Sequence, residues 1–135
     1  MGSKSDALEA DILKAVTGQA TTILTTTPLT NVYLALFTAT PSDAGGGTEV
    51  TGGSYARQQT VGKWGAPSGT TQVATNATIT FPTATADWGV VTSFGLFTAS
   101  TAGTLMYWGA LGASKTVSNG DTASVASGGL ILTED

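Results

Sequence analysis

The chain has 135 residues, and only 10% of them are charged, well below the roughly 25% of an ordinary soluble domain. It has no cysteine and no histidine, which excludes disulfides, thiolate or imidazole metal sites and catalysis by Cys–His or Ser–His–Asp arrangements. The net charge of −4 argues against nucleic-acid binding, and no apolar run is long enough to span a membrane as a helix.

The first segment predicts one short helix. Asp6 is placed to cap it, and Gly18 is a natural stop. Leu8, Ile12 and Val16 recur every four residues and form an apolar stripe. A helix this short is marginal without a partner, so these three residues are interface candidates, either for the body of the same chain or for a neighbour. The acids and the missing apolar core of this segment do not fit a signal peptide.

The remainder has the pattern of strands separated by turns. Val32–Thr38 is a nearly continuous apolar run, typical of a strand buried on both faces. Residues 73–81 alternate with a period of two and predict one long strand that ends at Pro82. Asn119 and Gly120 give the strongest hairpin signal.

These signals predict an all-β fold with a short N-terminal α-helix. The spacing of strands and turns is typical of an antiparallel β-sandwich or jelly roll. We expect an N-terminal helix and arm over residues 1–30 and a single β-sandwich domain over residues 31–135. Residues 35–40 (ALFTAT) resemble residues 95–100 (GLFTAS), which suggests that the two are paired core strands.

The tryptophans divide into two groups. Trp88 and Trp108 lie in strong strands and are predicted to be core residues. Trp64 lies between Gly62 and Pro67, so we expect it to be exposed and to make contacts with a partner. A carbohydrate-stacking platform of Trp and Tyr side chains is the alternative.

The glycine-rich segment at residues 43–49 (DAGGGTE) is predicted to be a surface loop. A phosphate-binding loop does not fit, because no Lys-Ser or Lys-Thr follows and the flanking acids repel phosphate. Weak calcium or glycan binding between Asp43 and Glu49 stays open. Catalysis by paired carboxylates is a minor alternative, because the acids stand at or near predicted turns. We expect no enzyme activity, no cofactor and no metal.

Several ordered motifs resemble a family of small tailed-bacteriophage virion proteins whose members are commonly labelled tail fibre proteins. The motifs are residues 33–50 (YLALFTATPSDAGGGTEV), 52–58 (GGSYARQ), 76–89 (NATITFPTATADWG) and 94–97 (FGLF), and the resemblance covers residues from about 31 to 133. The resemblance implies no catalytic residue. It marks Tyr55 and Arg57 as its clearest polar positions, and Arg57 is expected to donate hydrogen bonds to backbone or carboxylate oxygens.

The chain is short for a self-standing fibre, and the resemblance implies a capsid cement or decoration protein. Such a protein bridges major capsid subunits on the outer capsid surface, after synthesis in the host cytoplasm. The expected partners are the major capsid protein and the chain itself, as a homodimer or homotrimer, with no nucleic acid and no membrane. The interface candidates are Leu8, Ile12, Val16, Trp64, Tyr55 and Arg57. The alternative is a tail component, either a fibre-base adaptor or a receptor-binding tip.

Overall fold

One large antiparallel sheet, two short β-ribbons and a helix make up the part of the chain that the structure describes. A computed structural model describes residues 3–24, 29–69 and 72–133. The large sheet contains β1 (Ser3–Lys4), β2 (Tyr33–Ala39), β3 (Thr48–Glu49), β4 (Gln58–Gln59), β7 (Gly89–Phe97) and β8 (Leu105–Val117). Its strand order is β1-β8-β7-β2-β3, and β4 also pairs with β2. The ribbons join β5 (Gln72–Ala74) to β10 (Ile131–Thr133) and β6 (Ile79–Thr80) to β9 (Ser124–Val125).

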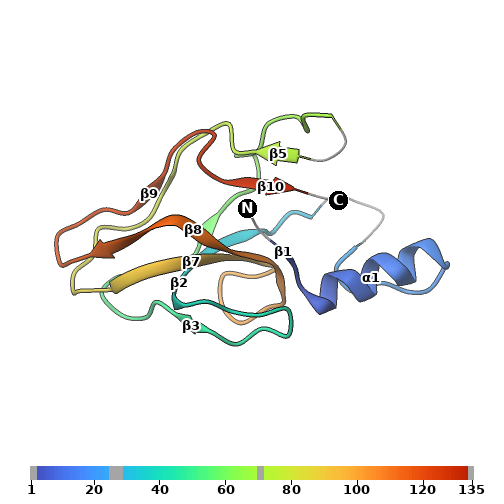
Figure 1. Ribbon diagram of the computed structural model, residues 1–135, viewed down its shortest axis with the longest axis horizontal. Coiled ribbons are helices and arrows are strands. Elements are labelled where there is room, and N and C mark those ends of the chain that lie inside the picture. The colour runs from blue at the N-terminus through green and yellow to red at the C-terminus, as the bar shows by residue number, and fades with distance from the viewer. Residues whose placement is uncertain (1–2, 25–28, 70–71, 134–135) are drawn as a thin grey trace.

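The molecule is built in two layers. The labelled strands of both ribbons lie on one side of the large sheet, and the helix α1 (Asp6–Val16) lies at one end of the molecule (Figure 1). The hydrophobic core fills the space between the layers and includes Leu34, Leu36, Ile79, Phe81, Val91, Phe94, Leu96 and Leu130. The predicted all-β class with a short N-terminal helix is confirmed.

The centre of the large sheet is the pair β2 and β7. Ala35 lies opposite Gly95, so the two similar segments are neighbouring strands, as the sequence predicted. Residues 34–37 are all buried, which confirms a strand covered on both faces. A Cβ atom on Gly95 would lie 2.9 Å from Leu105 Cδ1 and 3.1 Å from a ring atom of Phe37, so close packing across the sheet requires glycine there.

The prediction that Trp88 and Trp108 are core residues is right for Trp88, which directly precedes β7, and wrong for Trp108, which lies in β8. Trp88 is 5% exposed, and its ring stands edge-on to Tyr55 with the centroids 5.3 Å apart. Trp108 is only partly buried, and its Nε1 donates to Asp43 Oδ1 at 2.9 Å. Trp108 lies in β8, which among the described strands has the two-residue strand β1 as its outer neighbour.

Residues 73–81 do not form the single predicted strand. The chain leaves its pairing with β10 at Thr75, whose N–H donates to Leu130 O at 3.0 Å, and the next N–H, from Asn76, donates to Lys63 O at 2.9 Å. The strand then resumes as β6, which pairs with β9. Alternation of side chains predicted the extended backbone but not the change of partner.

The turn at Asn119 and Gly120 forms, but the hairpin does not. Asp121 closes the turn, because its N–H donates to Ser118 O and its carboxylate accepts the Ser118 N–H, both at 2.9 Å. The strand that follows, β9, pairs with β6 rather than returning along β8.

The helix is capped by Ser5 and not by Asp6. The Ser5 Oγ accepts the Leu8 N–H at 3.4 Å and donates to the carbonyl of Leu105. Asp6 lies inside the first turn, where its own N–H donates to Asp43 O at 3.1 Å. Because Ser5 follows β1 directly, capping the helix also attaches it to the sheet.

Candidate functional site

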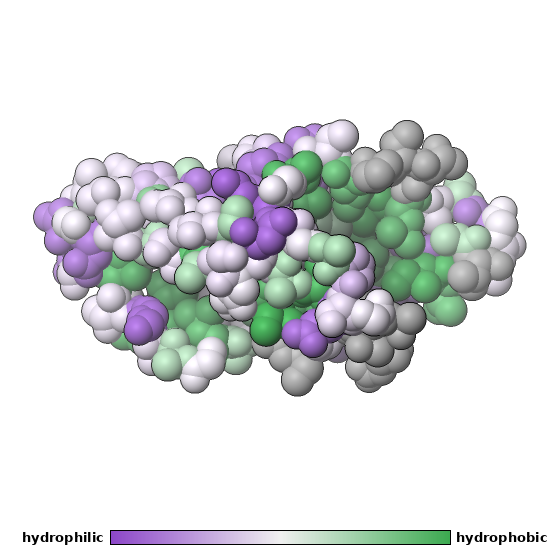
Figure 2. Space-filling view, turned by 90° about the horizontal axis from the view of Figure 1, so that it is seen from above, coloured by the Kyte–Doolittle hydropathy of each residue, from purple (hydrophilic) through white to green (hydrophobic). Residues whose placement is uncertain are grey.

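An apolar groove lies between α1 and the two layers of the sandwich. Its hollow measures about 480 Å³, and Figure 2 shows apolar side chains gathered around a hollow towards the end of the molecule that carries α1. The described lining consists of Leu8, Ile12, Ile23, Leu24, Leu29, Val32, Trp64, Val73, Leu96, Met106, Tyr107 and Leu132. We call this surface the helix groove.

The helix groove brings together three of the six predicted interface residues. Leu8 is 5% exposed, Ile12 is half-buried, and both line the groove together with Trp64. The backbone of Val16 belongs to α1, but its side chain lies outside the described part of the chain. The apolar stripe of the helix therefore faces the body of its own chain at Leu8 and Ile12.

Trp64 is less exposed than its neighbouring glycine and proline suggested. It is half-buried, its backbone forms an isolated bridge with Thr75, and its Nε1 donates to Thr60 Oγ1 at 3.3 Å. These contacts hold the indole against the groove wall rather than leaving it free in solvent.

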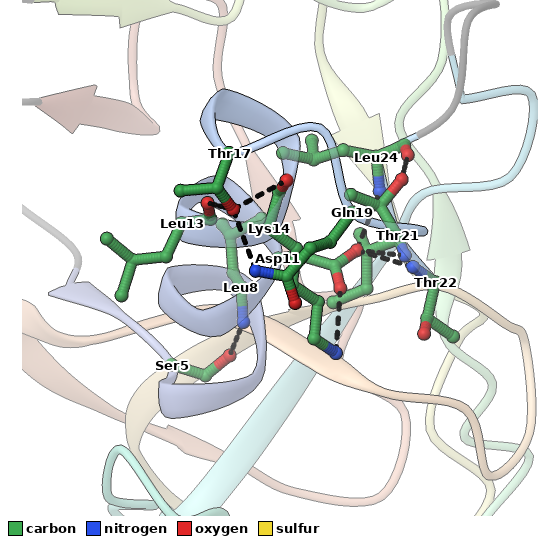
Figure 3. A network of polar contacts seen from close by, with 11 residues as sticks. Ser5, Leu8, Asp11, Leu13, Lys14, Thr17, Gln19, Thr21, Thr22 and Leu24 are labelled. Carbon is green, nitrogen blue, oxygen red and sulfur yellow. Dashed lines mark hydrogen bonds and ion pairs between the residues drawn. The ribbon is translucent and has the colours of Figure 1, made fainter.

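A buried carboxylate fixes the segment that follows the helix. Asp11 is 2% exposed, and its Oδ2 accepts N–H groups from Thr22 at 2.8 Å, from Leu24 at 3.0 Å and from Ile23 (Figure 3). Lys14 Nζ lies 3.9 Å from Asp11 Oδ1. Since Ile23 and Leu24 line the helix groove, Asp11 sets the position of one groove wall.

The surroundings of Asp11 favour its charged form. Burial raises the pKa of the carboxyl group, but the three backbone hydrogen bonds and the Lys14 ammonium outweigh burial and leave the pKa below its ordinary value of 3.8. This role of Asp11 was not predicted, although the sequence shows an acid in the second turn of the helix, ahead of a Thr-rich segment.

Tyr55 and Arg57, the other two predicted interface residues, lie in a separate polar cluster with Glu49. Arg57 holds the carboxylate with two bonds, from Nε at 2.8 Å and from Nη2 at 2.7 Å. The Tyr55 hydroxyl donates to Glu49 Oε1 at 3.0 Å and accepts the Leu36 N–H at 2.9 Å. Burial, and then the negative charge of Glu49, raises the pKa of Tyr55 well above its ordinary value.

Arg57 also ties this cluster to the turn between β7 and β8. Its Nη1 donates to Ala99 O at 3.0 Å and to Ala102 O at 2.7 Å. Its guanidinium lies over the Phe97 ring, 3.7 Å from the centroid. The expected hydrogen bonds from Arg57 to backbone and carboxylate are confirmed, and the side chain has a structural function within its own chain.

The acids of the glycine-rich loop already have partners. Asp43 accepts the Trp108 N–H, and Glu49 is held by Arg57 and Tyr55. Within the described ranges, no group of three or more acidic side chains is placed to hold a metal ion.

The glycine-rich loop requires glycine at position 47, because a Cβ atom on Gly47 would lie 2.6 Å from Ala39 O and its φ is +75°.

None of the helices in the described part of the chain has the length and apolar character needed to span a membrane. No protein of curated function matches the sequence. The model of the family Gp80, described as podophage GP4 fiber I protein gp80, matches residues 3–133. The chain therefore belongs to this family of podophage fibre proteins and is a structural protein of a phage virion.

Proposed function

We propose that this member of the podophage fibre family is a fibre component that works without catalysis, by binding copies of itself and neighbouring virion proteins. The observation that carries the proposal is the family match, which spans nearly the whole chain. A function based on contact also suits a chain with 10% charged residues, because few charges need to be desolvated when such a surface is covered.

The helix groove supports a role in binding. It exposes a concave apolar surface whose wall is fixed by the buried Asp11, so the surface is formed before any partner arrives. A preformed site loses less conformational entropy on binding than a site that must first become ordered.

A capsid cement protein is the second candidate. The low charge of the chain, which also suits a fibre component, fits a protein that lies against a larger shell. In that case the partner is the major capsid protein, and the chain occupies the outer capsid surface.

The copy number per particle separates the two roles. Quantitative mass spectrometry of purified virions would give the ratio of this chain to the major capsid protein. A fibre component is expected at about three to eighteen copies, whereas a cement protein is expected at several hundred, from the closed symmetry of tails and shells. Several hundred copies, or antibody labelling spread over the head, would overturn the fibre proposal in favour of cement.

The non-catalytic part of the proposal needs its own measurement. The purified chain should not cleave polysaccharide from the surface of the host cell. An assay that measures the release of reducing sugar ends would detect such cleavage. Cleavage that is lost on Glu49→Gln, in a variant that remains folded, would overturn it.

A further inference from the structure

Most of strand β8 has an open edge in the described part of the structure. β1 pairs with β8 only at Tyr107 and Trp108, and no other described strand lies on that side of β8. On its inner side, β8 pairs with β7 at Ala110 and again at Lys115, so that four residues of β8 stand opposite Thr92 alone. Residues 110–116 are exposed except for Leu111, which is half-buried. A strand edge of this kind offers N–H and C=O groups to another strand.

The sandwich is also open between this edge and the ribbon layer. Two adjoining hollows of about 250 and 140 Å³ lie between β8 and residues 123–131. Leu36 and Leu111 line both hollows, Val91 and Phe81 line the larger, and Phe94 lines the smaller. Closing this side would remove apolar surface from water, which stabilises association.

We propose that the open edge of β8 is the self-association surface, where β8 of a second copy pairs antiparallel about a two-fold axis. This inference rests on the self-association that we propose as part of the function, and it names the surface. Each copy presents the same edge, so a single two-fold axis allows the open N–H and C=O groups of both edges to pair with each other. The two large sheets are then joined into one. It also brings the two open sides of the sandwiches together, so that each apolar opening is covered.

The side chains along the edge fit this pairing. They are small or uncharged except for Lys115, and a Cβ atom on Gly112 would meet nothing within 4 Å. If Ala113 of one copy lies opposite Ala113 of the other, each Lys115 lies opposite Leu111 of the second copy. The two ammonium groups are then offset along the strand and do not lie directly opposite each other. The lysine stem covers apolar surface while its charge stays in water.

A lysine and a bulge on an edge strand are also devices that keep edges apart. A chain protected in that way stays monomeric, and this is the outcome that the experiment must distinguish from pairing.

The test is analytical ultracentrifugation of the full chain over a range of concentrations. We expect a dimer whose dissociation constant rises at least tenfold in Ala113→Lys, because the new charges face each other across the axis. Ala10→Lys, on the exposed face of α1, is the matched control and should leave the dimer unchanged. Circular dichroism would show whether each variant is folded.

Hydrogen exchange of the unmodified chain decides the question without a variant. Amides of residues 110–116 should exchange more slowly at high protein concentration, while those of α1 should not change. A chain that is monomeric up to about 1 mM, a dimer that folded Ala113→Lys does not weaken, or an association that leaves the β8 amides unprotected would each overturn the proposal. None of these results would change the copy number in the particle, so the proposed location in the virion is tested separately.

Discussion

Replacing Arg57 by alanine would measure how much the polar cluster stabilises the fold. The side chain of Arg57 is 8% exposed and that of Glu49 is 23% exposed, so the substitution leaves a carboxylate largely shielded from water. Four hydrogen bonds disappear, two to Glu49 and one each to the carbonyl groups of Ala99 and Ala102. Removing one partner of a buried pair costs about 3–5 kcal/mol. Because Glu49 keeps some exposure and its bond from Tyr55, we expect a loss of about 2–3 kcal/mol in the free energy of unfolding.

Urea unfolding followed by tryptophan fluorescence would give this free energy, and calorimetry should show a decrease in Tm of about 6–12 °C. Arg57→Lys keeps the charge but loses the planar fork, so it should cost about 1–2 kcal/mol. Combining Arg57→Ala with Glu49→Gln should cost less than the two single losses added together, because the two side chains interact directly. The reasoning is refuted if Arg57→Ala costs less than about 0.5 kcal/mol, or if the lysine variant is as stable as the original protein.

Three further predictions concern stability. Because the pKa of Asp11 is lowered, its charged form stabilises the fold at any pH above the ordinary pKa of 3.8, and this contribution is lost as the pH falls through the lowered pKa. Asp11→Asn should therefore be less stable than the original protein at pH 7 but lose less stability on acidification. Urea unfolding between pH 7 and pH 2 would measure both effects. Gly95→Ala should cost about 1–3 kcal/mol, because the added methyl group meets Leu105, whereas Gly112→Ala has open space and should cost nothing measurable in thermal unfolding. Ser5→Ala should lower stability by about 0.5–2 kcal/mol through loss of the cap, and an unchanged Tm would contradict the capping assignment.

The sequence predicted the parts of the fold that depend on local pattern. The apolar run in β2 and its similarity to β7 identified the two central strands, because a strand buried on both faces has a composition that few other elements share. The forked donor chemistry of Arg57 likewise predicted its bonds to oxygen atoms.

The errors lie where distant segments decide the structure. Trp108 resembles a core residue, but its strand lies next to the edge of the sheet, and strand order is not visible in alternation. The break at Thr75 depends on Leu130, which is 55 residues away. The helix groove itself was not predicted; Leu8, Ile12 and Trp64 were separate interface candidates, and most of the lining comes from segments that the chain brings together on folding.

The uneven burial of the tryptophans gives the molecule an intrinsic optical reporter. Trp88 lies in the core beside Tyr55 and should emit at short wavelength, whereas Trp64 and Trp108 are partly open to water and should emit further to the red. A quencher dissolved in the solvent should therefore reduce the long-wavelength part of the tryptophan fluorescence before the short-wavelength part. Occupation of the helix groove should shield Trp64 while leaving the emission of Trp88 unaltered, so binding and unfolding can be told apart without attaching a dye.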